Sequence, residues 1–593
     1  MTARLIALQN RFLGRGETIY DRLARLREEK GSLRAEDLLA LARETNLPPA
    51  HVRSVAKFYD ELAEEKPAKR KVRVCNGEPC AIRAGAACHD RLAKQASADV
   101  QVGEVTCLGH CGTGPNALVE DEDGARAVSL AEGGLEALEA ALREGAPIAL
   151  AAVPNAVHRA RDPRANVLLA RFGPEVVPLS RAREAGAYRA LEAALKSDPQ
   201  RVIDEVKASQ LRGRGGAGFP TGLKLQTVRD APSARGDKYI VVNGDEGDAG
   251  AFIDKELCEQ APHAVIEGML LAAYAAGASE GYLYVRGEYP RALAAIDRAL
   301  EECRQAGLLG DDILGSKFNF EAKLVRGHGA YVCGEETSLL RSLEGVPAQV
   351  SPKPPFPATH GLRGAPTAVN NVETLAVLPW IVEHGGAAYA ALGHGKSRGT
   401  KLVSLSGKVA CPGLYEVELG TPLRTLVFEL GGGVPNGKAF KAMQLGGPLG
   451  GILGPAHLDL RLDFEVIAQA GGMLGHASLV VFDEDVDLVR IGRGLERFCA
   501  IESCGKCFPC RLGSVRATEI FDKILEGRGT QDDLELLAEL NETMEVGSLC
   551  ALGGGIPIPI KNLLTTFVSD FAGHVPDAQV PLLLRSAPSR RKP

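Results

Sequence analysis

Apolar residues follow different periods in different parts of the chain, and each change of period predicts a different kind of structure. Residues 18–46 and 49–62 carry apolar side chains at helical spacing, with breaks at Gly31 and at Pro48-Pro49, so we expect a helical N-terminal region. From residue 71 onward, two short alternating runs flank a helical stretch, which predicts a small unit of strands and helices. Between residues 188 and 390, helical stretches alternate with short apolar runs, which is typical of an α/β domain.

The pattern changes twice more toward the C-terminus. Residues 401–430 predict a β-hairpin followed by a helix, the opening of a small β-grasp-like domain, and from Asp487 the pattern is helical. Residues 145–180 are rich in Ala, Pro and Arg, which favours a linker, with one predicted strand at residues 165–172. Together these patterns predict a multidomain α/β chain.

Length and composition narrow the classes of function. A chain of 593 residues is too long for one core, so several domains are expected. The formal net charge of −6 and the 5% aromatic content argue against nucleic acid as a main partner. The first residues lack the apolar segment of a secretory signal, and the most apolar stretch, residues 264–278, carries Glu267. We therefore expect a cytoplasmic protein without direct membrane insertion.

A first group of cysteines follows two predicted strands. Cys75 and Cys80 form C-x4-C, and Cys107 and Cys111 form C-x3-C. In a chain with no sign of export, such groups point to metal binding rather than to disulfides. Zinc pairs usually have the shorter C-x2-C spacing, so this group favours an iron–sulfur cluster, with structural zinc as the alternative.

A second group of cysteines lies near the C-terminus. Cys504, Cys507 and Cys510 form C-x2-C-x2-C, and Cys550 follows some forty residues later. Three thiolates on one tight turn with a distant fourth indicate a [4Fe–4S] cluster. The other cysteines are expected to be small buried hydrophobes: Cys88, Cys258, Cys303, Cys333, Cys411 and Cys499.

A glycine-rich stretch, residues 211–224, is the strongest candidate for a ligand loop. Its glycines allow positive φ and a close approach of a ligand, and their N–H groups can bind a phosphate. Arg214 and Lys224 add positive charge. The stretch contains a formal G-x-G-x-x-G, but residues 199–211 before it have helical spacing, so it is not a Rossmann fingerprint. The alternative is a mobile surface loop.

Polar clusters follow several predicted strands of the α/β region. Ligands of α/β sheets bind just beyond the carboxyl ends of the strands, so these clusters predict a converging site. Each cluster alone could instead be a solvated loop or a helix N-terminal charge. The residues are Asn243, Asp245, Glu246 and Asp248, then Tyr331, Gly334, Glu335 and Glu336, and then Lys353, Phe356, Asn370 and Asn371.

Six motifs in one order resemble a known family. They are RGRGGAGFPTGLK, NGDEGDAGAF, YVCGEET, KPPFP, VNNVET and ESCGKCFPCR with the later SLC. Over about residues 185–570 the chain resembles the NADH-binding flavoprotein subunit of respiratory complex I and its soluble relatives, the diaphorase subunits of NAD-reducing hydrogenases and NAD-dependent formate dehydrogenases. Through CNGEPC and CLGHC, residues 1–130 resemble the small thioredoxin-like [2Fe–2S] subunit of the same machinery. The chain thus resembles a fusion of two subunits.

The resemblance implies a domain order. The expected parts are an N-terminal helical region at 1–66, a thioredoxin-like [2Fe–2S] domain at 67–145, a linker at 146–180, an FMN and NAD(H)-binding domain at 181–395, a β-grasp-like (SLBB) domain at 396–480 and a C-terminal helical bundle with [4Fe–4S] at 481–593.

The resemblance also implies the residues of each site. FMN would be held by Gly213, Arg214, Gly215, Gly216, Lys224, Asn243, Asp245, Glu246, Tyr331, Gly334, Glu335, Asn370, Asn371 and Thr374. NAD(H) would stack on the flavin and contact Gly216, Ala217, Phe219, Asp248, Glu336, Lys353 and Phe356. One [2Fe–2S] cluster would be bound by Cys75, Cys80, Cys107 and Cys111, and one [4Fe–4S] cluster by Cys504, Cys507, Cys510 and Cys550.

Two positions depart from the complex I pattern. Leu225 and Thr227 stand where those flavoproteins typically have aromatic residues, and Asp248-Ala249-Gly250 stands where they typically have Glu-Pro-Gly. The NGDEGD form resembles formate dehydrogenase diaphorase subunits more closely. Negative charge at Glu336 and Asp248 predicts NAD rather than NADP, because it would repel a 2′-phosphate.

The resemblance implies an NAD(H) oxidoreductase that is one subunit of a larger complex. FMN exchanges hydride with the nicotinamide and single electrons with clusters, so we expect no catalytic side chain. The expected partner is the molybdenum or tungsten catalytic subunit of an NAD-dependent formate dehydrogenase, with further iron–sulfur clusters. The alternatives are an NAD-reducing hydrogenase and a complex I-like NADH dehydrogenase. A hypothesis of another class is a nucleotide-binding protein with zinc at both cysteine sites.

Overall fold

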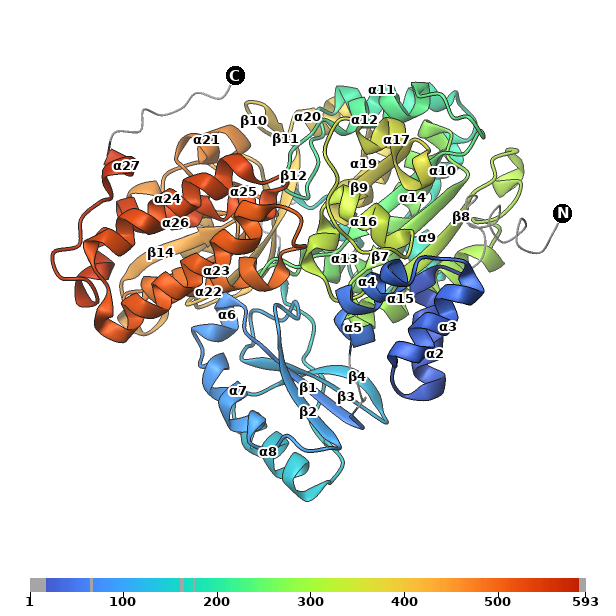
Figure 1. Cartoon of the computed structure of the whole chain (residues 1–593). Coiled ribbons are helices and arrows are strands. Elements are labelled where there is room, and N and C mark those ends of the chain that lie inside the picture. The colour runs from blue at the N-terminus through green and yellow to red at the C-terminus, as the bar shows by residue number, and fades with distance from the viewer. Residues whose placement is uncertain (1–16, 64–67, 160–164, 174–175, 586–593) are drawn as a thin grey trace.

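The computed structural model describes residues 17–63, 68–159, 165–173 and 176–585. The outer ends of the expected N-terminal and C-terminal regions and parts of the expected linker lie outside the described residues. In Figure 1 the α/β domain (green and yellow) lies beside the C-terminal half (orange and red), and the small domain that contains β1–β4 lies below and between them.

The N-terminal helices pack on the α/β domain rather than forming a separate body. Thr18 and Asp21 form a capping box at the start of the first helix, and Gly31, with φ +74°, ends it as the break in the pattern predicts. Leu23 and Val52 share one apolar cluster with Val241 of the α/β sheet. The helices are α2 (Ile19–Lys30), α3 (Ala35–Thr45), α4 (Pro49–Phe58) and α5 (Asp60–Ala63).

The small domain has the thioredoxin-like arrangement of strands and helices that the resemblance implies. Its sheet has the order β2-β1-β3-β4, with β1 parallel to β2 and antiparallel to β3. Its elements are β1 (Arg70–Cys75), α6 (Glu78–Ala81), α7 (Gly85–Ala93), β2 (Val100–Val105), β3 (Asn116–Asp121), β4 (Gly124–Ser129) and α8 (Gly134–Glu144).

The strand predicted at residues 165–172 is wrong. This segment contains the short 3-10 helix η2 (Leu169–Arg171) instead. The backbone N–H groups of Val167, Leu168 and Leu169 all donate to the buried carboxylate of Glu416, at 2.9–3.1 Å, so a side chain takes the place of a strand partner. The strand of this region is β5 (His158–Arg159), which pairs with the SLBB sheet.

The α/β domain is built on a parallel sheet of order β8-β7-β6-β9. Its strands are β6 (Tyr239–Gly244), β7 (Glu280–Val285), β8 (Glu321–Arg326) and β9 (Thr367–Asn371). Because the strands are parallel, their carboxyl ends meet at one edge of the sheet, and the polar residues that follow β6, β8 and β9 gather there.

Helices cover both faces of this sheet (Figure 1). The stretch at residues 264–278, expected to be a buried helix, forms most of α14, whose residues are nearly all buried. The helices are α9 (Leu179–Glu184), α10 (Arg189–Ala194), α11 (Pro199–Ala208), α12 (Thr221–Asp230), α13 (Ile253–Gln260), α14 (Pro262–Ala276), α15 (Pro290–Gln305), η3 (Ile313–Gly315), η4 (Tyr331–Gly334), α16 (Glu336–Leu343), α17 (Pro357–His360), η5 (Leu362–Gly364), α18 (Val372–Ala376), α19 (Leu378–His384) and α20 (Gly386–Ala390).

The SLBB domain contains the predicted hairpin, formed by β12 and β13. Its sheet has the order β15-β14-β16-β12-β13-β5, and the segment after the hairpin is a π-helical turn, η6. The elements are β10 (Gly393–His394), β11 (Ser397–Arg398), β12 (Thr400–Gly407), β13 (Gly413–Glu418), η6 (Thr425–Leu430), η7 (Pro435–Gly437), β14 (Phe440–Leu445), β15 (Gly451–Leu453), η8 (Pro455–His457), α21 (Phe464–Gln469) and β16 (Ser478–Asp483).

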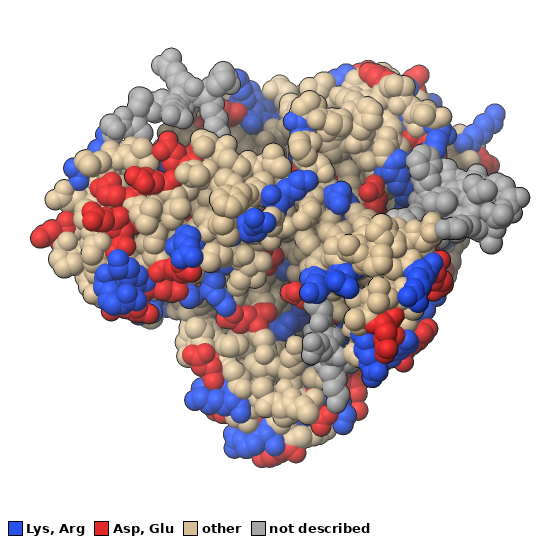
Figure 2. All heavy atoms as spheres, viewed as in Figure 1, with Lys and Arg blue, Asp and Glu red and all other residues tan. Residues whose placement is uncertain are grey.

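The C-terminal region is helical, as expected from residue 487 onward. Its elements are α22 (Leu488–Glu502), α23 (Phe508–Lys523), η9 (Ile524–Arg528), α24 (Gln531–Gly547), α25 (Ala551–Gly555), α26 (Pro557–Thr566), η10 (Val568–Gly573) and α27 (Leu582–Arg585). Across the described ranges, no helix is both long and apolar enough to span a bilayer. Figure 2 shows basic and acidic residues interspersed on one face, with no large area of a single sign.

Candidate functional site

The glycine-rich loop connects α11 to α12 and faces both the α/β sheet and the SLBB domain. Its ends are closed by the N–H of Gly213, which donates to the carbonyl of Phe219 at 2.8 Å. Gly216 has φ +115° and Gly218 has φ +62°, a region that favours glycine. A Cβ on Gly215 would lie 3.0 Å from Cβ of Asn371, so the loop lies directly against the end of β9.

Polar residues at the strand ends face the same region. Asn243, at the end of β6, donates from Nδ2 to the carbonyl of Gly334 at 2.9 Å and so ties together two of the predicted clusters. Among the atoms that the structure describes, Oδ2 of Asp245 and Nδ2 of Asn370 are buried and have no hydrogen-bond partner. Burial raises the pKa of Asp245 well above its usual range. Buried polar atoms of this kind are expected where a polar ligand completes the site.

Glu335 and Glu336, which are expected near the cofactors, form a helix cap and ion pairs within the protein. Glu335 caps α16 by accepting hydrogen bonds from the N–H groups of Thr337 and Ser338, at 2.9 and 3.0 Å. Lys353 Nζ bridges Oε1 of Glu335 and Oε1 of Glu336, at 2.8 and 2.7 Å. Burial opposes the charge of Lys353, but the two carboxylates outweigh it and raise its pKa.

The cations expected on the phosphate side point in different directions. Lys224 is half-buried and donates to the carbonyl of Val369 at 2.8 Å, and desolvation lowers its pKa. The Arg214 side chain is fully buried and points toward Tyr389 Oη at 2.9 Å and the carbonyl of Arg398 at 2.7 Å. Its Nε and Nη1 have no partner within the described part of the chain.

Tyr331 and Asp248 lie toward the C-terminal helices. The Tyr331 hydroxyl donates to Oδ1 of Asp248 at 2.6 Å, and its ring contacts Phe498 of α22 edge-on. Phe219 and Phe356, the two aromatic residues expected at NAD(H), are 47% and 55% exposed. The expected NAD(H) residues therefore include an exposed rim, whereas the expected FMN residues, apart from the exposed Gly215, are buried or half-buried.

The structure brings the cysteines of the first group into one buried region. Cys75, Cys80, Cys107 and Cys111 are all buried and unbridged. The sulfur atoms of Cys107 and Cys111 are 3.4 Å apart. A hydrogen bond from Cys80 lowers the pKa of Cys75 to about 7, so this pair is close enough to share a proton. Four sulfur atoms gathered in a buried pocket fit an iron–sulfur cluster.

The second group lies where α22, α23 and α25 meet. Cys510 is buried in the first turns of α23, and Cys504, Cys507 and Cys550 are partly exposed. Leu549 N–H donates to Cys507 Sγ at 3.3 Å, which brings the distant fourth position to the first three. Cys499, which the spacing does not single out, lies beside Cys510 and lowers the pKa of that thiol to about 7 by a hydrogen bond.

Two side chains that the sequence did not single out join the first cysteine group to the strand ends. Arg286, just after β7, donates to the backbone carbonyls of Cys107 at 3.2 Å, Thr106 at 3.1 Å and Glu246 at 2.9 Å. The Tyr289 hydroxyl also donates to the carbonyl of Glu246 at 2.9 Å. The first cysteine group is therefore joined by hydrogen bonds to the polar residues at the end of β6.

The sequence patterns also did not predict a network of buried charged residues next to the glycine loop. It joins His476 of the SLBB domain to Glu246 and Asp254, and Lys401 of β12 to Glu373 of α18. The partners of each ion pair are separated by 28 to 230 positions in the sequence. No period or motif connects them, so only the packing of the two domains reveals the network.

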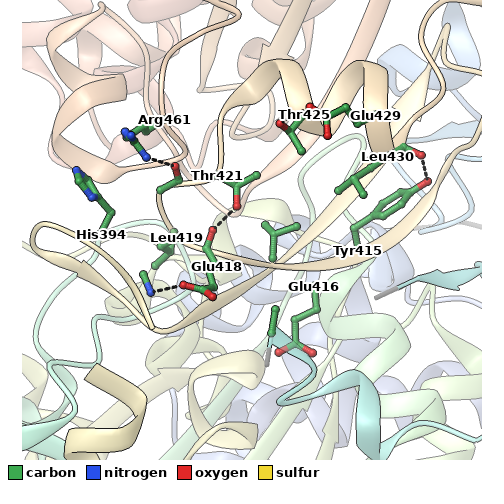
Figure 3. Close-up of a pocket in the computed structure, with 14 residues that line it drawn as sticks. His394, Tyr415, Glu416, Glu418, Leu419, Thr421, Thr425, Glu429, Leu430 and Arg461 are labelled. Atoms are coloured by element: carbon green, nitrogen blue, oxygen red, sulfur yellow. Dashed lines mark hydrogen bonds between the residues drawn. The ribbon is translucent and has the colours of Figure 1, made fainter. Parts of the chain in front are cut away.

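A separate pocket lies on the SLBB domain and contains none of the predicted site residues. Figure 3 shows its lining, including His394, Glu418, Thr421 and Arg461, around a volume of about 390 Å³. Its polar groups are largely satisfied locally: Arg461 donates to the carbonyl of Gly420 at 3.1 Å, and Thr421 to that of Glu418 at 2.8 Å. None of its lining residues is expected to contact FMN or NAD(H).

Comparison with protein-family models agrees with the geometry. The Nuo51 FMN-binding domain matches residues 206–380, the SLBB domain 402–453, the NADH-ubiquinone oxidoreductase-F iron-sulfur binding region 491–574, and the thioredoxin-like [2Fe-2S] ferredoxin 8–129. The expected fold class and the expected FMN, [2Fe–2S] and [4Fe–4S] cofactors are thereby confirmed, and the iron–sulfur interpretation is favoured over zinc.

Curated relatives match most of the chain. The NADP-reducing hydrogenase subunit HndC of Solidesulfovibrio fructosivorans is 45% identical over 66% of this chain and 80% of its own length. The F 2 subunit of the NADH-quinone oxidoreductase of Rhizobium meliloti (strain 1021) is 44% identical over 68% of this chain and 96% of its own length.

A solved structure matches nearly the whole chain. It is a chain of an NAD+-reducing [NiFe]-hydrogenase in the H2-reduced state, with a TM-score of 0.81 and 31% identity over 95% of this chain and 94% of that chain. The small N-terminal domain and the larger C-terminal part are therefore combined in one chain in that enzyme as well.

Replacing Gly216 tests the glycine loop. Gly216→Ala places a Cβ at φ +115°, 3.5 Å from the backbone of Gly475. The strain of roughly 1–2 kcal/mol should weaken FMN binding by a factor of roughly 5–30 if the bound loop keeps this conformation. The measurement is FMN affinity of the apoprotein, followed by flavin absorbance.

Gly236→Ala is the matched control. Gly236 also has positive φ, +78°, but lies in an exposed turn where no described heavy atom is within 4 Å of an added Cβ. It should cost similar backbone energy and leave FMN affinity unchanged. Unchanged FMN affinity in Gly216→Ala would contradict the assignment of the loop.

Proposed function

The chain belongs to the family of NADH-quinone oxidoreductase F subunits and related hydrogenase subunits, and we propose that it is the NAD(H)-linked electron-transfer subunit of an NAD-dependent formate dehydrogenase. That it is an NAD(H) oxidoreductase subunit with FMN and iron–sulfur clusters follows from family membership and the matching domains. The formate dehydrogenase context, the individual site residues and the domain boundaries given above are proposals.

The observation that carries the proposed FMN site is the set of buried polar atoms without partners beside the glycine loop. Asp245 follows β6, Asn370 lies at the end of the neighbouring β9, and Asn371 contacts the loop itself. Bound FMN supplies hydride exchange with nicotinamide and single-electron exchange with clusters. The proposed task of the side chains is to orient and enclose the flavin. Gly213, Gly215 and Gly216 leave room for close approach, and Lys224 supplies a positive charge.

The proposed NAD(H) site lies at the exposed rim. The ring centre of Phe219 is 6.0 Å from Lys224 Nζ. The charges of Glu336 and Lys353 act on the pKa of Lys224, so these four residues are neighbours. Phe219 and Phe356 offer apolar faces to the nucleotide, and Asp248 lies deeper, held by Tyr331. Arg214 is proposed to support the loop from behind, because its guanidinium binds Tyr389 and the Arg398 carbonyl.

Apolar side chains exposed around the second cysteine group support a docking surface for the partner. Ile501, Phe508 and Leu549 are 59%, 65% and 51% exposed, and they lie within three residues of Cys504, Cys510 and Cys550 respectively. Large apolar side chains in contact with water are typical of an interface. An electron carrier that docks there would lie next to the [4Fe–4S] site, so we propose that electrons pass to or from the partner at this face.

We propose that the partner is a catalytic subunit that carries molybdenum or tungsten and further iron–sulfur clusters. Support comes from the NGDEGD form at residues 243–248, which resembles formate dehydrogenase diaphorases. A hydrogenase partner is the second candidate, favoured by the nearly full-length similarity to a chain of the NAD+-reducing [NiFe]-hydrogenase.

Cysteine substitutions should separate the two clusters. Cys510→Ala should remove the [4Fe–4S] EPR signal while NADH still reduces the flavin, and Cys107→Ala should remove the [2Fe–2S] signal and leave NADH–dye reductase activity largely intact. The matched control is Cys88→Ala, a buried cysteine in the apolar cluster of the small domain, which should keep both signals. Loss of flavin reduction in Cys107→Ala, or of a signal in a control, would show that the assignments are wrong.

NADH should be preferred to NADPH by at least about tenfold in kcat/KM, equivalent to about 1.4 kcal/mol. The physical reason is the negative charge of Glu335, Glu336 and Asp248, which Lys353 only partly offsets. Glu336→Gln should reduce the preference, whereas Glu301→Gln on the exposed face of α15 should not change it. Equal use of the two nucleotides by the native protein would contradict this proposal.

Purification from the native source under mild anaerobic conditions should recover a large partner with molybdenum or tungsten and formate-dependent reduction of NAD+. Metal analysis and activity with formate, hydrogen and quinone are the measurements. A partner that contains nickel, or one that reduces quinone and does not use formate, would end the formate dehydrogenase proposal.

A further inference from the structure

His476 is a buried imidazole that connects two domains at the cofactor site. It lies in the SLBB domain just before β16 and is 5% exposed. Its Nδ1 is 3.4 Å from Oε1 of Glu246, and its Nε2 is 3.2 Å from Oδ2 of Asp254. Both carboxylates belong to the α/β domain, so the imidazole lies between two acidic groups contributed by a different domain.

We propose that His476 is a fixed cation of the flavin site: its imidazolium holds the SLBB loop against the glycine loop and favours the reduced state of the bound flavin. This inference rests on the proposed FMN site. His476 lies outside the six motifs, and its proposed role is to carry a fixed positive charge rather than to transfer a proton.

The position of His476 follows from its neighbours. A Cβ on Gly216 would lie 3.5 Å from Gly475, the residue before His476, so this turn lies directly on the glycine loop. Asn371, which lies against Gly215, donates from Nδ2 to Oδ2 of Asp254 at 2.5 Å. His476 and its carboxylate partners therefore lie immediately behind the loop and the strand end that are proposed to hold FMN.

The surrounding charges keep the imidazole protonated. Glu246, Asp254 and Asp248 face it from the α/β domain, and Lys401 of β12 is the cation that opposes it. Burial disfavours the charged form of His476, but Asp254 and then Glu246 outweigh it and raise the pKa to about 9. At neutral pH the group therefore stays charged. A buried positive charge near a flavin favours the reduced, more negative state.

Glu246 is fixed independently of His476, which makes the ion pair a rigid one. Its carboxylate accepts the N–H groups of Ile253, Asp254 and Lys255, at 2.6–3.0 Å, and so caps the first turn of α13. The same three side chains, Glu246, Asp254 and His476, could instead hold a metal ion. Three backbone donors on Glu246 and the nearby ammonium of Lys401 favour a proton over a metal, and metal analysis separates the two.

The decisive experiment compares His476→Gln with the native protein and with His394→Gln, an exposed histidine of the same domain. The midpoint potential of bound FMN is measured in the full-length, FMN-loaded protein between pH 7.5 and 10. At pH 7.5 the reduction equilibrium should shift at least tenfold toward the oxidised state in His476→Gln, about 30 mV for a two-electron couple. His394→Gln should match the native protein.

The pH dependence distinguishes a charge from a structural role. The folded pKa of His476 is raised, so its contribution is fully present at pH 7.5 and is lost as the pH rises through about 9. Glutamine carries no charge at any pH, so the difference between native and variant should shrink above pH 9. Glu246, whose pKa is raised to about 7 by burial and by Asp254, is largely ionised in this range.

Asp254→Asn provides a second test if His476→Gln loses FMN. Removing this carboxylate lowers the pKa of His476, so the contribution of His476 to the potential should be lost at a lower pH than in the native protein. Native-like potentials in both variants, a difference that is constant with pH, or a metal ion that is lost with His476→Gln would each overturn the inference. A native protein that binds no FMN would instead overturn the proposed function itself.

Discussion

The arrangement of the site depends on the buried position of Glu246. Its carboxylate is held by three N–H groups of α13 and by His476, and its carbonyl accepts hydrogen bonds from Arg286 and Tyr289. A buried carboxylate without such partners would cost several kcal/mol. The partners come from the α/β domain and the SLBB domain, and Arg286 extends the contacts to the loop of Cys107. The hydrogen bonds and the ion pair of Glu246, together with those of Arg286, therefore connect the α/β domain, the SLBB domain and the small domain.

This constraint explains how one chain can bring its redox sites together. The cysteine loop of the small domain packs into the core of the α/β domain, where Cys107 and Cys111 share an apolar cluster with Phe252 and Ile253. On the other side, Tyr331 links Asp248 to Phe498 of the helix that leads to the second cysteine group. The proposed flavin site lies between these contacts. The exposed apolar residues near Cys504 and Cys550 then provide a face for a partner, and the proposed NAD(H) rim is a different set of exposed residues.

The sequence predicted much of this structure, because local signals carried it. Helical periods and caps such as Thr18 and Gly31 were sufficient for the N-terminal helices, and cysteine spacing was sufficient for both cluster groups. Residues 165–172 were assigned to a strand because their apolar content resembles one, yet their N–H groups bind Glu416, nearly 250 positions away. The roles of His476, Arg286 and Lys401 were not predicted for the same reason: they depend on ion pairs or hydrogen bonds across domain boundaries, which no local period encodes.

An anaerobic titration of the full chain with NADH, followed by visible absorbance and low-temperature EPR, tests the central claim most directly. If the chain transfers electrons between NADH, FMN and two clusters, the purified protein should be yellow-brown, NADH should bleach the flavin absorbance, and two distinct iron–sulfur signals should be found across chemical and NADH reduction. A colourless protein that contains stoichiometric zinc and does not respond to NADH would contradict the account.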